Sequence, residues 1–402
     1  HDRDRHARRR EAARSVSRRH EELKGRRRQM IKIPEGIEQF AKLPRWWRVD
    51  VPTEVIVSAD GISTLYELIE SRGVKPFFVI DSALKDQPAF ARLFERNDVF
   101  AFNASYSEVR TSDVDELVSL LHQRGGDGLT LIGIGGGSTM DLAKAAGLCC
   151  ANPLRAQDYQ GYGIPMERGL DVWTVPALNG TGAELTPIAV MRGPEKKLGI
   201  NNPLAAARLA VIDPRLSAGA PAFNRFYTMM DCYFHHYEIS RSRTSSPDAI
   251  ADSLDGLELS GRVLSCDLSE YDEQRAVLSA MASVLGGSSS TGGRVGAAHA
   301  ISYGLSNCAP FLPHSVAVTL AMLALKDVYP DGYAETLRFH KISRRELPRA
   351  SAYGLSEADI PRMTATALGM EKLWQSCFGP ERWKELATPK YISSVYRAIV
   401  KG

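Results

Sequence analysis

The sequence predicts two domains: an α/β domain built on a mostly parallel sheet, followed by an all-helical domain. Short apolar runs alternate with amphipathic stretches from about residue 53 to Pro214, as strands and crossover helices do around a parallel sheet. The run at 129–134 is apolar without alternation, which is typical of a central strand buried on both faces. After Pro214, long helical patterns follow with little strand signal. The 402 residues suffice for two cores, and we place the boundary near residue 215.

The elements of the two domains are expected in the following order. Strands are predicted at 54–58, 76–80, 98–103, 129–134, 172–178, 188–192 and 209–214, and helices at 62–73, 112–125 and 138–150. Gly73 should end the first helix, and Ser112 should cap the second. The helical domain should contain helices at 222–240, 272–286, 294–306, 314–329 and 359–376.

Charge is unevenly distributed along the chain. Residues 1–29 hold eleven Arg and one Lys against five acids, a net charge of +7, so the rest carries about −4 of the overall +3. This segment lacks apolar periodicity and is expected to be a basic, disordered leader, with domains at 30–215 and 216–402. The mildly acidic remainder argues against a nucleic-acid enzyme. No apolar run approaches a membrane span of roughly 18 residues. Six cysteines without a C-x-x-C pair fit a reducing cytoplasm.

A glycine-rich turn, IGIGGGSTMD at 132–141, joins a predicted strand to a predicted helix. Residues without side chains let backbone N–H groups approach a pyrophosphate, and the helix N-terminus adds partial positive charge. Ser138 can cap this helix or donate to a phosphate. The pattern reads G-x-G-x-x-S and lacks the acidic residue that usually follows about 20 residues later, so a plain βα turn stays open as an interpretation.

Asp81 ends the predicted strand at 76–80 and is a candidate for binding the adenosine ribose. A carboxylate there would hold the ribose hydroxyls and would favour NAD over NADP by repelling a 2′-phosphate. A helix-capping Asp is the competing interpretation.

Four residues in the second domain form a candidate metal site. Asp231 and His235 are spaced i, i+4, so a helix would place them on one face, where a buried carboxylate and imidazole require partners. His299 and His314 each begin or interrupt an apolar helix. Three imidazoles and one carboxylate suit Zn²⁺ or Fe²⁺ better than Mg²⁺ or Ca²⁺. An Asp–His hydrogen bond in the core is the competing interpretation, and His236 points about 100° away and is not an expected ligand.

The metal site and the glycine turn together predict a metal-assisted, nicotinamide-dependent dehydrogenase. A Lewis acid with an open position lowers the pKa of an alcohol and stabilises the alkoxide from which hydride leaves. The order of residues offers no Ser–His–Asp set, nucleophilic Cys or phosphate-binding Walker loop that competes with this interpretation.

Segments 135–141, 179–186, 231–238 and 299–314 together resemble the iron-containing, or type III, alcohol dehydrogenases over about residues 50–402. The resemblance implies a dehydroquinate synthase-like fold with an N-terminal dinucleotide-binding domain, a helical C-terminal domain, and NAD with one divalent metal between them. It implies that the metal ligands are Asp231, His235, His299 and His314. It implies cofactor contacts from Asp81, Asn103, Gly136, Gly137, Ser138, Thr139, Asp141, Leu178, Asn179, Thr181 and Lys197.

The sequence departs from the family pattern at four places, one of them the start of the first strand–helix unit, which reads VSADGIS at 57–63. Ala177 and Leu178 replace a usual Thr-Thr pair, and the interval from His299 to His314 is one residue longer than usual. Tyr303 stands four residues after His299, where the family often has a second His. A helix places Tyr303 on the face of His299, so its hydroxyl is a candidate substrate contact.

The combination DYQGYG, LNGTGAE, GPEKKLGIN and HAISYGLS is similar to the 3-deoxy-manno-octulosonate 8-oxidase branch of the family. This similarity implies oxidation of the terminal primary alcohol of a sugar acid to an aldehyde. The alternatives are another polyol or alcohol dehydrogenase of the family, a sugar-phosphate cyclase resembling dehydroquinate synthase, and a non-enzymatic protein of the same fold. We expect a small-molecule substrate, a cytoplasmic location and a homodimer, without nucleic-acid or membrane partners.

Overall fold

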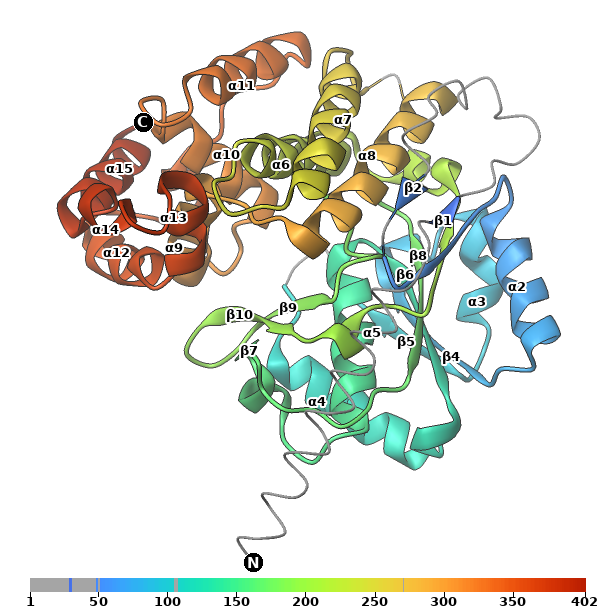
Figure 1. The fold of residues 1–402 in the computed structure, drawn as a ribbon. Coiled ribbons are helices and arrows are strands. Elements are labelled where there is room, and N and C mark those ends of the chain that lie inside the picture. Colours follow the sequence, from blue (N-terminus) through green and yellow to red (C-terminus); the bar gives the residue numbers. More distant parts are fainter. Residues whose placement is uncertain (1–28, 31–47, 50, 105–107, 270) are drawn as a thin grey trace, which may run out of the picture. The chain divides into compact units, whose positions relative to one another are not determined.

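The computed structural model describes residues 29–30, 48–49, 51–104, 108–269 and 271–402 (Figure 1). It divides into two compact units. The first ends at Ala177 and resumes over Ala183–Leu216, and the second comprises Leu178–Gly182 and Ser217–Gly402. The predicted basic leader at 1–29 lies, apart from Gln29, outside the described residues.

A six-stranded, fully parallel sheet organises the first unit. Its spatial order is β3 (Glu54–Val57), β11 (Leu209–Ile212), β8 (Asp171–Pro176), β6 (Thr130–Gly135), β4 (Pro76–Asp81) and β5 (Val99–Phe102). Every residue of β6 is buried, as its unalternated apolar sequence predicts. The predicted α/β class is therefore confirmed.

Helices cover both faces of this sheet. Leu131 of β6 packs in one apolar cluster with residues of α4 (Thr111–Gln123) and α5 (Gly137–Cys150). Ile132, the next residue, packs on the opposite face with Leu65 of α2 (Gly61–Arg72) and Leu93 of α3 (Ala91–Phe94). Adjacent strand residues face opposite sides, so Leu131 and Ile132 contribute to different cores.

The predictions of helix ends were right for α2 but wrong for α4. Gly73 ends α2 in the left-handed conformation, as expected. Ser112 does not cap α4, because the helix begins one residue earlier, at Thr111. Arg110 is its N-cap residue, and the Asp113 carboxylate accepts a hydrogen bond from the Arg110 N–H at 2.8 Å.

A smaller sheet was only partly predicted. It contains β7 (Gly161–Tyr162), β10 (Lys197–Asn201) and β9 (Ile188–Arg192), and only β9 was expected. β10 pairs antiparallel with β9. A separate pair joins β1 (Gln29–Met30) to β2 (Arg48–Val49).

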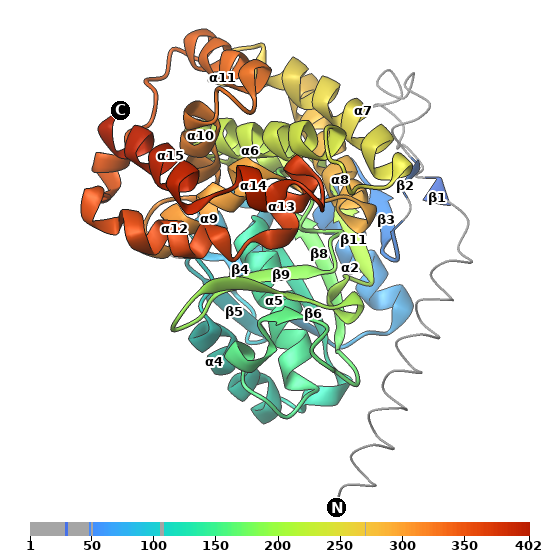
Figure 2. The same ribbon diagram turned by 60° about the vertical axis from the view of Figure 1, so that its left-hand side comes forward.

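The described part of the second unit is helical (Figure 2). Its helices are α6 (Ala222–Ser240), α7 (Pro247–Leu264), α8 (Glu273–Gly292), α9 (Ala297–Cys308), α10 (His314–Ala324), α11 (Pro330–Ile342), α12 (Ile360–Leu368), α13 (Glu371–Phe378), α14 (Trp383–Leu386) and α15 (Pro389–Lys401). Among the described residues, no helix combines the length and apolarity that crossing a membrane requires.

Several helix predictions in this unit need correction. α7, α11 and α15 were not expected, although each begins with Pro at its first position. The helix expected at 314–329 stops at Ala324, before Pro330 starts α11. The helix expected at 359–376 is two helices, interrupted at Gly369 and Met370.

The segment Leu178–Gly182 follows β8 but belongs to the second unit. The Gly180 N–H donates to the Ser283 hydroxyl of α8 at 3.1 Å. Gly182 has a φ of +83°, and a Cβ there would overlap the backbone of Gly287. The segment therefore lies directly on α8, in a position that only a residue without a side chain permits.

Candidate metal centre and nucleotide-binding turn

Asp231, His299 and His314 come together in the second unit, each from a different helix. Asp231 lies on α6, His299 on α9 and His314 at the start of α10, and both α6 and α9 pack against α10. One ligand atom from each residue lies within 4.8 Å of the others, and these three residues are called the metal-ligand group below because they could hold a metal ion. Asp231 and His299 are buried, and His314 is half-buried. The longer interval between the two histidines is therefore compatible with their convergence.

The electrostatics of this group fit a divalent cation. Asp231 Oδ1 is buried without a hydrogen-bond partner, and His299 Nε2 is 3.4 Å away. Burial raises the pKa of Asp231, but the charge of His314, the direct side-chain contact with His299 and the charges of His299 and His235 outweigh burial, so the pKa is lowered. A carboxylate oxygen without a hydrogen bond, facing imidazole nitrogens, is a donor set that Zn²⁺ or Fe²⁺ accepts.

His235 does not join this compact group. Its Nε2 lies 3.0 Å from the Ser290 hydroxyl of α8, and its ring centroid is 5.9 Å from that of His299. Burial, and then the charges of His299 and His236, lower the pKa of His235 to about 3, so the ring is neutral at neutral pH. Ligation by His235 would require its ring to exchange the Ser290 contact for the cation.

His236 occupies a different environment from its neighbour. Its ring is buried, Nε2 lies 3.0 Å from the carbonyl oxygen of Ala282, and a Cβ on Gly256 would overlap the ring. His236 is thus enclosed by α7 and α8 and is not part of the metal-ligand group.

Glu238 is a neighbour of the group that sequence reasoning missed. Its side chain is fully buried, and Oε2 lies 2.5 Å from His299 Nδ1. The signal was present in the sequence, because Glu238 follows Asp231 by seven residues and His235 by three, which puts all three on one helical face.

Tyr303 lies one helical turn after His299 on α9 and is half-buried. Its ring centroid is 6.3 Å from that of His314. The side chain is therefore beside the metal-ligand group, where a substrate contact was expected.

The glycine turn leaves the start of α5 accessible. Gly136 is the N-cap residue without a side-chain cap, so Ser138 does not cap this helix, and Gly137 is exposed. The first hydrogen bond within the helix runs from the Met140 N–H to the Gly136 carbonyl. The preceding N–H groups of this turn are the ones that a phosphate binds at a helix N-terminus.

Asp81 and Thr139 flank this turn. A Cβ on Gly135 would come within 2.9 Å of the Cβ atoms of both residues, and the buried Thr139 hydroxyl has no hydrogen-bond partner. β4 and β6 are neighbours, and the strand order reverses between them. Ligands of open α/β sheets bind at the carboxyl ends of strands at such a reversal.

Asp81 also has the capping role that we considered as the alternative. Its Oδ1 accepts a hydrogen bond from the Ala83 N–H at 3.0 Å. Burial raises the pKa of Asp81, and hydrogen bonds from Ala83 and Ala104 oppose this effect. Capping and ribose binding are compatible, because a carboxylate has two oxygens.

The remaining residues expected at the cofactor have varied environments. Asp141 is buried, pairs with Lys144 at 2.8 Å and accepts a hydrogen bond from the Val190 N–H at 3.0 Å, so it braces α5 against β9. Burial raises its pKa. Lys197 is buried and forms an ion pair with Glu108. Asn103 lies in the first unit and is exposed. Leu178, Asn179 and Thr181 belong to the second unit.

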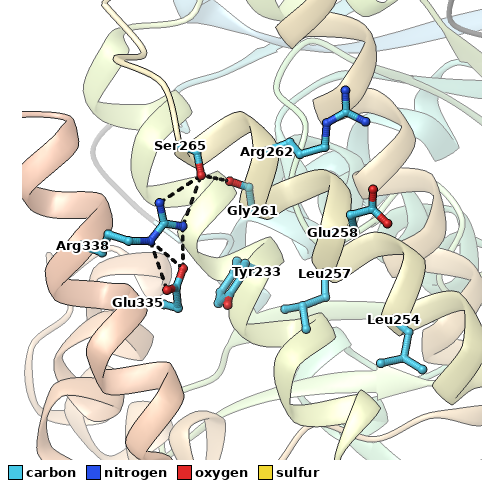
Figure 3. A pocket seen from close by; sticks show the side chains of 9 residues that line it. All are labelled: Tyr233, Leu254, Leu257, Glu258, Gly261, Arg262, Ser265, Glu335 and Arg338. Carbon is cyan, nitrogen blue, oxygen red and sulfur yellow. Dashed lines mark hydrogen bonds and ion pairs between the residues drawn. The ribbon is translucent and has the colours of Figure 1, made fainter.

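A groove on the second unit is lined by other residues than Asp231, His299 and His314, and Figure 3 shows its lining side chains. It has a volume of about 520 Å³ and lies between α7, α11 and Tyr233 of α6. Arg338 crosses it, donating to Glu335 at 2.6 Å and to the Ser265 hydroxyl at 3.2 Å. Its lining includes none of the predicted site residues, and two of its charged residues, Arg338 and Glu335, pair with each other.

Comparisons with known proteins support the predicted family. Residues 52–214 match the sequence profile described as iron-containing alcohol dehydrogenase. Choline dehydrogenase of Bacillus subtilis (strain 168) is 28% identical over 327 residues, 78% of each chain. NAD-dependent methanol dehydrogenase of Bacillus methanolicus is 25% identical over 262 residues, 63% of this chain and 68% of that one.

The fold also has close matches among solved structures. The crystal structure of sulfoacetaldehyde reductase from Bifidobacterium kashiwanohense in complex with NAD⁺ aligns with a TM-score of 0.73 at 19% identity. The alignment covers 87% of this chain and 97% of that one. An α/β unit followed by a helical unit is thus the fold that the two chains share.

Proposed function

We propose that the chain, whose residues 52–214 match the iron-containing alcohol dehydrogenase profile, is a metal-dependent dehydrogenase that oxidises a primary alcohol of a sugar acid to an aldehyde. The proposed substrate resembles a 3-deoxy-octulosonate, and NAD⁺ is the proposed hydride acceptor. The observation that carries the proposal is the convergence of Asp231, His299 and His314 around a buried carboxylate oxygen without a hydrogen bond.

These residues would hold the metal ion, with His235 as the fourth ligand after release from Ser290. A bound Zn²⁺ or Fe²⁺ supplies Lewis acidity, which lowers the pKa of the substrate hydroxyl in a reaction where NAD⁺ accepts the hydride. Asp231 contributes the negative charge that offsets the cation, and the imidazoles contribute neutral nitrogen ligands. Tyr303, beside His314, would orient the substrate through its hydroxyl.

The glycine turn at Gly136 and Gly137 is the proposed pyrophosphate site, with Ser138 and Thr139 as hydroxyl donors. Asp81, next to this turn, is the proposed partner of the adenosine ribose. Its negative charge would disfavour a 2′-phosphate, which supports NAD as the preferred coenzyme.

The choice of a sugar acid rests on sequence segments that include DYQGYG and HAISYGLS, and on Tyr303 in place of a second His. The relatives are named for choline, methanol and sulfoacetaldehyde, so proteins of similar sequence or fold act on chemically different compounds. The residues around the metal, rather than the fold, must therefore decide the substrate.

A substrate screen tests the proposal. Purified protein is supplied with Zn²⁺ or Fe²⁺ and NAD⁺, and NADH formation is followed at 340 nm with octulosonic acids, polyols, choline and methanol. We expect the highest kcat/KM with an eight-carbon sugar acid. Equal or faster oxidation of simple alcohols would reject the sugar-acid assignment, and no NADH with any alcohol would reject the dehydrogenase.

Two variants test the role of Tyr303 in substrate choice. Tyr303→His restores the usual family residue and should shift the preference toward simple alcohols. Tyr303→Phe keeps the ring but removes the hydroxyl, so it should lower kcat/KM for the sugar acid without that shift. Unchanged kcat/KM in Tyr303→Phe would contradict a hydroxyl contact with substrate.

A further inference from the structure

Glu238 contacts the His299 imidazole in a way that can fix the orientation of its ring. We propose that Glu238 is a positioning residue, which fixes His299 so that Nε2 faces the metal; this rests on the metal-dependent function proposed above. Oε2 of Glu238 lies 2.5 Å from Nδ1 of His299, and both side chains are buried. On the other side of the same ring, Nε2 faces Asp231 Oδ1 at 3.4 Å.

The carboxylate is itself held in place by the backbone at the start of α9. The Gly296 N–H donates to Oε2 at 2.9 Å, and the Ala298 N–H donates to Oε1 at 2.7 Å. With His299, three donors converge on one carboxylate. The Glu238 side chain is fully buried, so these three donors, rather than water, surround its carboxylate.

This arrangement determines the tautomer of His299. An ionised carboxylate only accepts hydrogen bonds, so Nδ1 must carry the proton that it donates to Glu238. In the neutral ring, Nε2 then keeps its lone pair for a cation. Carboxylates in this position orient ligating imidazoles and increase their basicity, and their loss typically weakens metal binding 10–100-fold.

A purely structural role for Glu238 makes a different prediction. Glu238 also satisfies two N–H groups at the N-terminus of α9, so its loss could loosen this helix without any specific effect on His299. Tyr329 provides a matched control, because its hydroxyl accepts from the Ala297 N–H of the same turn at 3.0 Å and donates to Cys377 at 3.3 Å. It supports the helix start through the backbone.

The experiment compares the Zn²⁺ dissociation constants of wild type, Glu238→Gln and Tyr329→Phe by chelator competition, without substrate. Co²⁺-loaded samples give an absorption spectrum that reports ligand geometry. We expect Glu238→Gln to bind Zn²⁺ about 10–100-fold more weakly and to alter the Co²⁺ spectrum. Tyr329→Phe should lower the melting temperature but keep the affinity within about threefold.

Wild-type affinity in Glu238→Gln, or equal weakening in Tyr329→Phe, would overturn the proposal. If Glu238→Gln does not fold, NMR of ¹⁵N-histidine-labelled wild type loaded with Zn²⁺ decides. A protonated Nδ1 and a metal-bound Nε2 on His299 support the proposal, and the opposite tautomer rejects it.

The same measurements separate this proposal from the proposed function. Tight Zn²⁺ binding without oxidation of any alcohol would reject the dehydrogenase, while the role of Glu238 would still be decided by the affinities. Failure of wild type to bind any divalent cation would reject both.

Discussion

His235 shows how the conformation of one side chain can change the composition of a site. The sequence places it one turn from Asp231, yet its ring contacts Ser290 on α8. Ser290 also donates its hydroxyl proton to the Gly286 carbonyl at 2.7 Å, so its oxygen is available to accept from the imidazole. A metal–nitrogen bond from His235 would replace its contact with Ser290.

His235→Ala should remove a metal ligand and lower kcat/KM by at least about a hundredfold, while NAD⁺ binding persists. Coenzyme affinity is measured by fluorescence titration, and turnover at 340 nm. Ser290→Ala is the matched variant, because it removes the competing hydrogen bond and should retain metal affinity. Normal turnover in His235→Ala would show that three ligands suffice.

Asp81→Ser should increase the use of NADP relative to NAD about tenfold or more, because the charge facing a 2′-phosphate is removed. The ratio of kcat/KM for the two coenzymes measures this change. Asp60→Ser is the control, since Asp60 caps α2 by accepting from the Ser63 N–H at 3.1 Å. If the two variants shift the ratio equally, Asp81 is not a ribose contact.

His340 predicts a pH dependence of stability away from the metal site. Burial, and then the charge of Arg345, lower its pKa, although the hydrogen bond to the Thr336 carbonyl opposes this. Below the ordinary pKa of 6.5 the unfolded chain gains a proton that the folded ring resists, so the free energy of unfolding falls as the pH drops through that range.

Urea titrations between about pH 7.5 and 5.5 measure this loss of stability. His340→Gln should reduce the pH dependence. An identical slope in wild type and His340→Gln would exclude His340 as the titrating group.

At the scale of elements, helices and strands were predicted correctly where the pattern of apolar and turn residues lies within the element itself. The strands β3, β4, β6 and β11 are short apolar runs between turns, and they lie within one or two residues of their predicted positions. α7 was missed despite its Ser246 cap and Pro247, because charged residues and glycines interrupt the apolar pattern of its sequence. β10 was missed because its sequence, KLGIN, becomes a strand only by pairing with β9.

The same distinction applies to the candidate site. Residue type and spacing in the sequence identified Asp231, His299 and His314 as candidate metal ligands. The contact between Glu238 and His299 joins two helices across 61 residues, and no local pattern encodes such a pairing. The orientation of His235 depends on Ser290, a residue with no distinguishing signal of its own.

The crossing of α6 and α7 makes a specific prediction about packing. Gly256→Ala would place a methyl group inside the space of the buried His236 ring, which should lower the free energy of unfolding by about 1–3 kcal/mol. Gly261→Ala lies on the same helix, but its Cβ would be 3.5 Å from Tyr233, an ordinary contact. It should be neutral or stabilise by up to about 1 kcal/mol. Equal melting temperatures for the two variants would contradict this packing.

At the scale of the whole molecule, the chain passes between the two units three times, because Leu178–Gly182 belongs to the second unit. The amide of Asn179 donates to the Ser217 hydroxyl at 3.1 Å, and that hydroxyl lies 3.1 Å from the Tyr271 hydroxyl. A fragment of residues 217–402 would lack the Asn179 contact and the segment that covers α8.

We therefore expect the fragment 217–402 to unfold at a lower temperature than the same fragment preceded by residues 178–182 and a short linker. Circular dichroism measures both transitions. Zn²⁺ at 100 times its dissociation constant should stabilise whichever fragment binds it by about 2.7 kcal/mol. Identical melting temperatures would show that the segment contributes nothing to the helical unit.

The five residues after β8 have a practical consequence for protein engineering. A chimera that exchanges the helical unit between relatives at a single junction near residue 217 would keep the host's version of 178–182. The donor α8 would then meet a foreign loop at Gly182, where its backbone leaves no space for a Cβ. Grafting this unit therefore requires two transplanted pieces of chain, one of them only five residues long.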